Sequence, residues 1–122
     1  IEAIKYINQK NLIFDNIFKL SGRYYLNDDF DFQLFDNNYN QFVLWDNNFN
    51  SYASLFYKIK FKYLNLLLTC FEYFSNRLKN GETLEILLNK YFNLYMNYHN
   101  ITILNKMNIS GNLSTEGYFF TI

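Results

Sequence analysis

The 122-residue sequence contains no proline, only four glycines and a single cysteine, Cys70. The absence of proline and the shortage of glycine exclude collagen-like, proline-rich and glycine-rich linker proteins. A single cysteine cannot form an intrachain disulfide, and it also excludes a structural zinc site built from cysteines. The length allows one domain with an extension rather than two domains of ordinary size.

Long apolar runs are missing as well. The longest uncharged apolar stretch, 64–71, includes Asn65 and Thr69 and is far shorter than the roughly 20 residues of a membrane-spanning helix. The N-terminal apolar run is interrupted by Glu2 and Lys5, which is unlike a secretory signal. We therefore expect no membrane span.

What the chain has in excess is asparagine, with 20 residues, and aromatic residues, which make up 22% against 18% charged residues. Asn, Phe, Tyr, Ile and Lys have A/T-rich codons, whereas the scarce Pro, Ala, Gly and Arg have G/C-rich codons. In this respect the sequence resembles proteins encoded by very A/T-rich genomes, in particular protist mitochondrial genomes; a nuclear A/T-rich genome is the alternative. The resemblance implies a mitochondrial protein and narrows the functions to ribosomal proteins and respiratory-chain subunits.

The N-terminal half predicts a helix followed by short strands. Apolar residues near helical spacing predict a helix over 1–23 that ends at Ser21-Gly22. Alternation around Phe30, Phe32 and Leu34 predicts a half-exposed strand. Two Asp-Asn-Asn sequences, 36–38 and 46–48, predict turns between aromatic strand ends and hence a meander.

The C-terminal half predicts a strand, a helix pair and two more strands. Residues 57–63 alternate between lysine and apolar residues, and residues 64–79 then show helical spacing that ends at Asn80-Gly81. A second helix is predicted to follow and to run to about Tyr98, with Leu84, Leu87, Leu88, Tyr91 and Tyr95 facing inward. Further predictions are alternation at 101–103, a turn at 110–112 and a strand over 118–122.

These elements predict an α+β fold, with an N-terminal helix, a small antiparallel sheet with Asp-Asn-Asn turns, and a helix hairpin packed on one face. We expect residues 1–56 to form an N-terminal helix and aromatic, Asn-rich extension, and residues 57–122 to form the α+β domain. The net charge is zero, but residues 24–57 contain five Asp and no Lys or Arg, so the middle of the chain is acidic.

Candidate metal and catalytic groups have simpler structural interpretations. Two segments place oxygen ligands at the first, third and fifth positions of a calcium loop but lack its Gly and its final Glu, so turns are favoured: Asp36, Asn38, Asn40 and Asp46, Asn48, Asn50. Cys70 and His99 could form a catalytic pair, but a buried thiol and a helix cap are favoured. Asp29 and Asp31 could share a strand face, but a solvated loop or a contact with a basic partner is favoured. We expect no enzyme, no metal and no cofactor.

The lysines of the 57–63 strand are the strongest binding signal. Lys58, Lys60 and Lys62 would line one face, beside aromatic residues, in a way that suits phosphates and unstacked bases. Lysines that protect an exposed sheet edge are an equally good explanation.

The segment Tyr57 to Lys79, a basic strand that leads into a Leu-rich helix, resembles the start of the small-subunit ribosomal protein ten family. Residues 110–115 and 118–122 are similar in outline to that family's loop and following strand, with Ser or Asn in place of proline. Residues 82–100 would be an insertion, residues 1–56 are unmatched, and the family's second helix and last strand are missing. The resemblance implies rRNA contacts at Lys58, Lys60 and Lys62 and at the loop residues Ser110, Gly111 and Asn112.

From these features we expect a non-catalytic structural component of a mitochondrial ribosome, with the small subunit favoured. Its partners would be ribosomal RNA and neighbouring ribosomal proteins, and the aromatic excess suggests an obligate member of a large hetero-assembly. The alternative is a peripheral structural subunit of a mitochondrial respiratory-chain complex, which the neutral net charge favours.

Overall fold

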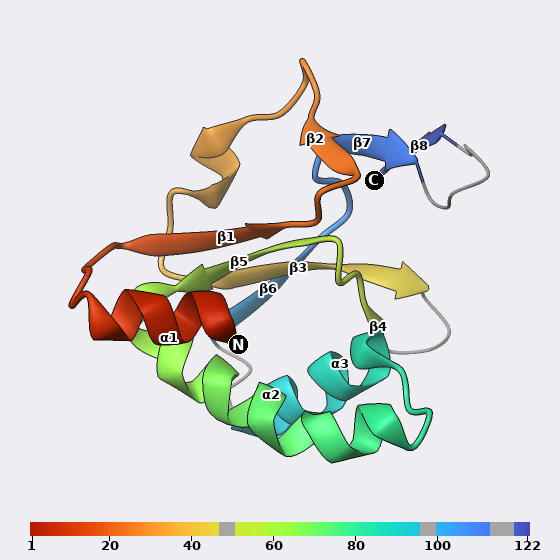
Figure 1. Ribbon diagram of the computed structural model, residues 1–122. Helices are drawn as coiled ribbons and strands as arrows, with labels where there is room; N and C mark the ends of the chain where they lie inside the picture. Colours follow the sequence, from red (N-terminus) through yellow and green to blue (C-terminus); the bar gives the residue numbers. More distant parts are fainter. Residues whose placement is uncertain (47–50, 96–99, 113–118) are drawn as a thin grey trace.

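The computed structural model has an α+β fold, as predicted (Figure 1). It describes residues 1–46, 51–95, 100–112 and 119–122. In chain order, the elements are α1 (Glu2–Gln9), β1 (Asn16–Leu20), β2 (Tyr24–Leu26), the 3-10 helix η1 (Phe32–Phe35), β3 (Asn40–Asp46), β4 (Ser51–Tyr52), β5 (Phe56–Lys60), the 3-10 helix η2 (Phe61–Tyr63), α2 (Leu64–Lys79), α3 (Leu84–Tyr95), β6 (Ile101–Leu104), β7 (Ile109–Asn112) and β8 (Phe119–Thr121).

The main sheet joins strands that are far apart in the sequence. β5 lies between β1 and β3 and is antiparallel to both, with Ile17 opposite Ile59 and Gln41 opposite Lys58. β4 pairs antiparallel with the end of β3, whereas β6 pairs parallel with its beginning. The sheet is thus mostly antiparallel, with one parallel neighbour that the sequence pattern does not predict.

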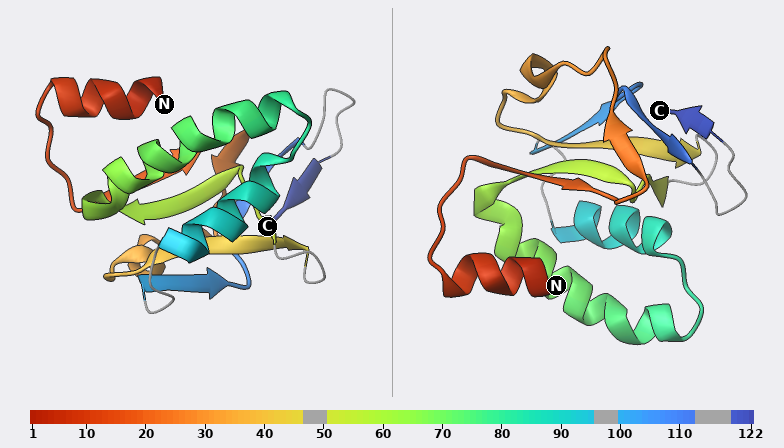
Figure 2. Two further views of the ribbon diagram at one scale, coloured as in Figure 1. Left: turned by 90° about the horizontal axis from the view of Figure 1, so that it is seen from below. Right: turned by 45° about the horizontal axis from the view of Figure 1, so that its top comes forward.

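Two other layers cover the main sheet. In Figure 1 the helices lie below it, and the view from below in Figure 2 shows α2 and α3 crossing that face. A second antiparallel sheet, in the order β2-β7-β8, lies above it together with η1. The main sheet is therefore buried from both sides over much of its area.

Each face of the main sheet has its own core. On the helix side, β5 contributes Tyr57 and Ile59, which pack with buried residues of the helices: Ile4, Leu64, Leu67, Cys70, Phe74, Leu87, Leu88, Tyr91 and Phe92. On the opposite side, Phe56 of β5 packs with Phe35 of η1 and Ile109 of β7. Successive residues of one strand thus enter different cores, as the pleat requires.

The predicted helix pair is confirmed. α2 occupies the predicted range. The chain turns after it at Gly81, whose φ of +90° is a backbone conformation that glycine adopts without a Cβ penalty. Leu87, Leu88 and Tyr91 of α3 face inward as predicted. The helix prediction for residues 96–98 lies outside the described residues, as does the side chain of Tyr95.

The N-terminal prediction is wrong beyond residue 9. The sequence predicts one helix over 1–23, but α1 ends at Gln9 and residues 16–20 form β1. Ile17 packs against the helix-side core while Phe18 stacks on Phe56 of the opposite core, so both faces of β1 are apolar. An apolar run that contacts apolar residues on both faces of a strand can resemble helical spacing, and this explains the error.

Three further local predictions are corrected. The strand predicted around Phe30, Phe32 and Leu34 is the 3-10 helix η1, which Asp31 caps by accepting a hydrogen bond from the Gln33 N–H at 2.9 Å. The predicted strand over 57–63 ends at Lys60, and Phe61 begins η2. The turn predicted at 110–112 is instead part of β7.

The Asp-Asn-Asn segments are partly described. The chain bends at 37–39, directly after Asp36, and Asn37 Oδ1 accepts a hydrogen bond from the Tyr39 N–H at 3.0 Å. This turn follows η1 rather than a strand. The second segment includes Asn47 and Asn48, which lie outside the described residues, although β3 and β4 on either side of it pair antiparallel.

The expected division at residues 56 and 57 falls within β5, whose two neighbours both precede it in the sequence. The segments 1–56 and 57–122 therefore share one sheet. Among the described helices, none has the length and apolar character needed to cross a bilayer.

Candidate functional site

Lys58, one of the predicted RNA-binding residues, is buried: its side chain is 0% exposed. Its Nζ donates hydrogen bonds of 2.9 Å to both the backbone carbonyl oxygen and the side-chain Oδ1 of Asn37. Burial lowers the pKa of the Lys58 ammonium to about 8, and neighbouring Lys60 adds to this effect while Asp36 opposes it. Lys58 thus stabilises the bend before β3 through its hydrogen bonds to Asn37, and it is not part of an exposed lysine face.

Lys60 and Lys62 are more accessible than Lys58, but only Lys60 belongs to the same strand as Lys58. Lys60 ends β5, and its backbone N–H donates to Asn40 Oδ1 at 2.8 Å. Lys62 is exposed on η2, with its Nζ 5.1 Å from the ring centroid of Tyr63. Of the predicted lysine surface, the accessible residues are therefore Lys60 and Lys62, and Lys62 lies beside an aromatic ring.

The predicted loop 110–112 forms the middle strand of the small sheet. Ser110 is 3% exposed, and its hydroxyl accepts a hydrogen bond from Asn27 Nδ2 at 2.9 Å and lies 2.7 Å from the Thr121 hydroxyl. A Cβ on Gly111 would lie 2.4 Å from the carbonyl oxygen of Arg23. Asn112 is exposed, whereas Ser110 and Gly111 have structural roles inside the fold.

The candidate chemical groups do not converge in the described part of the chain. Cys70 is buried in the helix-side core, where burial raises the pKa of its thiol to about 11, and His99 lies outside the described residues. Asn40 of the first calcium-like segment is buried, and its Nδ2 donates a hydrogen bond to the Asn100 carbonyl oxygen at 3.2 Å. No cluster of three or more potential metal-binding His, Cys, Asp or Glu occurs among the residues the structure describes.

Asp29 and Asp31 do not share a strand face; both are exposed and lie outside the strands. Asp31 precedes η1 and caps it, and Asp29 lies in the turn that follows β2. The carbonyl oxygen of Asp29 accepts a hydrogen bond from Asn108 Nδ2 at 3.0 Å, which ties this turn to the segment before β7.

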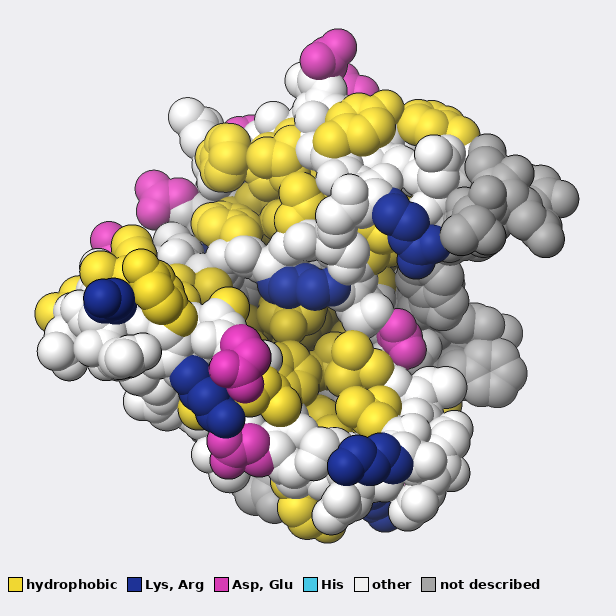
Figure 3. Space-filling model, viewed as in Figure 1, with side chains coloured by type: hydrophobic (Ala, Val, Ile, Leu, Met, Phe, Trp, Pro, Cys, Tyr) yellow, Lys and Arg dark blue, Asp and Glu magenta, His cyan; other side chains and the backbone are white. Residues whose placement is uncertain are grey.

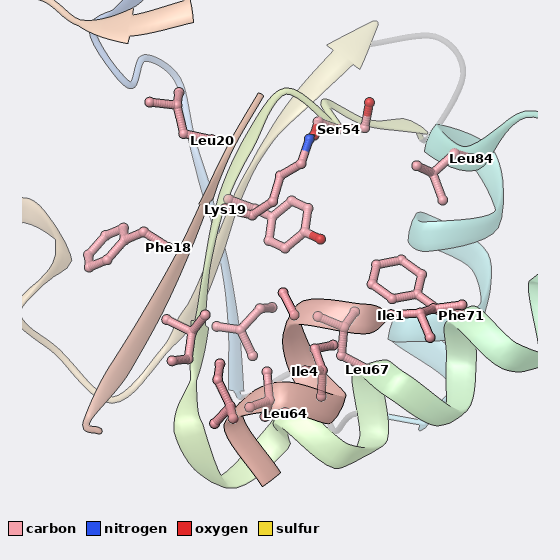
Figure 4. A pocket seen from close by; sticks show the side chains of 15 residues that line it. Ile1, Ile4, Phe18, Lys19, Leu20, Ser54, Leu64, Leu67, Phe71 and Leu84 are labelled. Atoms are coloured by element: carbon pink, nitrogen blue, oxygen red, sulfur yellow. The ribbon is translucent and has the colours of Figure 1, made fainter. Parts of the chain in front are cut away.

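A groove that the sequence does not predict opens between α1, β1 and α2. It has a volume of about 440 Å³, and Figure 4 shows its apolar walls. α1 contributes Ile4 and Ile7, and α2 contributes Leu64, Leu67 and Phe71. Since β1 is at the edge of the main sheet, the groove lies directly against that edge on the helix side.

The positively charged side chain of Lys19, from β1, lines this groove. Its Nζ donates to the Ser21 hydroxyl and to the backbone carbonyl oxygen of Ser54, and the Ser54 hydroxyl donates to the Glu85 carboxylate. Burial lowers the pKa of the Lys19 ammonium, and the negative charge of Glu85 opposes that shift. Lys19 and Glu85 offset one another, so the groove is apolar with a locally neutral polar end.

The opposite face of β1 carries a cluster of phenylalanines. The ring of Phe18 lies 5.9 Å from that of Phe56 in a stacked arrangement, and it meets Phe32 and Phe35 edge-on at 6.1 Å and 5.6 Å. Figure 4 shows Phe18 and Lys19 extending from opposite faces of β1. Phe32 is 60% exposed, so this cluster reaches the surface beside β1.

Comparison with known proteins finds no matching protein family and no significantly similar curated protein or solved structure. The site is therefore defined by its own geometry. It consists of the edge strand β1, which has apolar surface on both sides, and of two lysines, Lys60 at the end of β5 and Lys62 just beyond it.

Proposed function

We propose that the protein is a non-catalytic structural component of a mitochondrial ribosome, most consistent with the small subunit. The observation that carries this proposal is its apolar surface: among the described residues, 18 large hydrophobic side chains are exposed. Apolar patches of this kind on a small chain are typical of surfaces that partners cover. The codon-related composition supports the mitochondrial assignment.

In this proposal Lys60, Lys62 and Tyr63 supply the contact with ribosomal RNA. Cations that neutralise phosphates, next to a ring on which a base can stack, suit single-stranded RNA. Asn112 is the residue of the predicted 110–112 loop that remains exposed, and it is a second point of contact. The edge of β1 and its groove serve a neighbouring protein.

A peripheral structural subunit of a respiratory-chain complex is the second candidate. It is supported by the zero net charge and by the burial of Lys58, which leaves few free cations beside β5. Such a subunit would use the same apolar surface to bind protein alone.

Fractionation of the native organelle tests the two candidates. A ribosomal component is expected to co-sediment with ribosomal subunits in moderate salt, and cryo-EM of that fraction would locate it. Co-migration with a respiratory complex on native gels, without ribosomal co-sedimentation, would reject the first proposal in favour of the second.

A further inference from the structure

β1 is an edge strand with hydrogen-bonding groups that point away from the sheet. The Asp15 carbonyl oxygen accepts from the Phe61 N–H at 3.0 Å, and the Ser21 N–H donates to the Leu55 carbonyl oxygen at 2.8 Å. In an antiparallel pair the bonded residues alternate, so Ile17 and Lys19 also bond toward β5.

The residues between them, Asn16, Phe18 and Leu20, therefore direct their backbone N–H and C=O groups outward. These groups have no partner within the described parts of the chain. Each residue offers one donor and one acceptor at strand spacing, and such a row is a template for another strand.

Apolar surface flanks this row on both sides. On the helix side lies the groove between α1 and α2, and on the other side lie the exposed rings of Phe18 and Phe32. In Figure 3, β1 runs across the middle of the visible face, with hydrophobic surface above and below it. A strand added here would direct alternate side chains to these two surfaces.

Acidic residues outnumber basic ones in the segments that flank β1, β2 and η1. Five exposed aspartates adjoin β1, the turn after β2 and η1: Asp15, Asp28, Asp29, Asp31 and Asp36. The ion pairs of the described residues join Lys5 to Glu2 and Arg77 to Glu82, so none involves these aspartates. Their combined field attracts a positively charged partner.

We propose that the free edge of β1 binds an extended segment of a neighbouring protein as an additional strand. The segment would have alternating apolar residues, one set in the groove and the other against Phe18 and Phe32, with Lys or Arg at its flanks facing the aspartates. Its backbone would supply the missing partners of Asn16, Phe18 and Leu20. This inference deepens the proposed function, on which it rests for the presence of a neighbouring protein.

The test uses the full chain and a fluorescent synthetic peptide in which Val and Thr alternate between flanking lysines. Leu20→Pro removes an N–H that points away from β5, which an edge strand tolerates, while Leu20→Ala removes the side chain and keeps the N–H. Once both variants are shown to be folded by circular dichroism, we expect Leu20→Pro to bind the peptide about tenfold more weakly than Leu20→Ala.

Amide hydrogen exchange gives a second readout that does not depend on a variant. In the free protein the amides of Ile17 and Lys19 should exchange slowly and those of Phe18 and Leu20 quickly. Peptide binding should protect Phe18 and Leu20. A peptide N-methylated on alternate amides should not bind, and flanking glutamates should weaken binding.

Three results would overturn the proposal: equal binding by the two Leu20 variants, unchanged exchange at Phe18 and Leu20, or equal binding of the glutamate-flanked peptide. A dimer in solution with Phe18 and Leu20 already protected would replace the partner segment with a second copy of the chain. Because these assays use purified protein, they can fail while ribosomal co-sedimentation succeeds, and the reverse also holds.

Discussion

The Lys58 ammonium is held by one residue, Asn37, which accepts hydrogen bonds of 2.9 Å through its backbone carbonyl oxygen and through its side-chain Oδ1. This contact joins the middle of β5 to the bend before β3. It keeps a cation inside the fold with two neutral acceptors, an arrangement in which desolvation of the charge is only partly offset.

The first prediction concerns the pH dependence of stability. The pKa of Lys58 falls from 10.5 to about 8 on folding, so between these pH values the unfolded chain binds more protons than the folded one. The cost of burying the Lys58 charge is greatest below about pH 8. The contribution of Lys58 to the free energy of unfolding should therefore rise by about 1 to 2 kcal/mol from about pH 8 to about pH 9.5. Urea denaturation at several pH values measures this rise.

Two variants make this measurement specific. Lys58→Met should remove the contribution of Lys58 to the rise. It should leave the contribution of Lys19, whose pKa burial also lowers, and the opposing one of Cys70, whose pKa burial raises. Lys62→Met, at an exposed position, should leave the rise unchanged. The measurement stops at about pH 9.5 because burial raises the pKa of Tyr57, and its unfolded-state ionisation would favour unfolding at higher pH. Parallel curves for the wild type and Lys58→Met would contradict the assignment.

The second prediction concerns RNA. If Lys60 and Lys62 each neutralise a phosphate, the double variant Lys60→Ala/Lys62→Ala should bind single-stranded RNA more weakly, with the salt dependence of log K reduced by about 2. Filter binding over a series of salt concentrations measures the slope. Lys5→Ala/Lys10→Ala, on and just after α1, is the matched control. Equal slopes for the two double variants would exclude a specific role for Lys60 and Lys62.

The third prediction separates structure from RNA binding at Gly111. A Cβ there would lie 2.4 Å from the Arg23 carbonyl oxygen and 2.9 Å from the Tyr24 Cα, so the pairing of β2 with β7 would have to shift. Gly111→Ala should destabilise the protein by about 1 to 3 kcal/mol in a denaturation experiment. At Gly22 a Cβ meets nothing within 4 Å, and Gly22→Ala should change stability much less. A stable Gly111→Ala protein with impaired RNA binding would restore the original interpretation of this residue.

The fourth prediction concerns the thiol of Cys70. Burial raises its pKa to about 11, so little thiolate is present near neutral pH. Iodoacetamide should modify the folded protein slowly, and the rate should increase by orders of magnitude in denaturant. Mass spectrometry follows the reaction. Rapid modification of the folded chain would show that Cys70 is accessible and would reopen a chemical role for it.

The elements that could be predicted are those with local signals. α2 was correctly predicted because its leucines follow helical spacing and because Asn80-Gly81 marks its end, where Gly81 has positive φ. β6 and β8 were predicted from short alternating or aromatic runs. In each of these elements the sequence neighbours of a residue decide its environment.

The candidate site could not be predicted to the same extent, because it depends on distant pairings. Alternation within β5 correctly separates Lys58 from Tyr57 and Ile59, but the burial of Lys58 depends on Asn37 in another segment. The edge of β1 depends on which strands pair with β5. The alternation of apolar Phe18 with charged Lys19, which lie on opposite faces of β1, is the sequence feature that indicates a strand here. The surrounding apolar residues follow helical spacing and therefore favour a helix instead.

The parallel pairing of β3 with β6 also has a consequence for the order of folding. Residues 40–43 lie beside residues 101–104, so this side of β3 has no neighbour until the second segment has left the translating ribosome. Non-local pairings of this kind fold slowly, and an unpaired strand on a nascent chain is prone to aggregation. The unpaired side of β3 therefore stays exposed on the nascent chain until β6 is made.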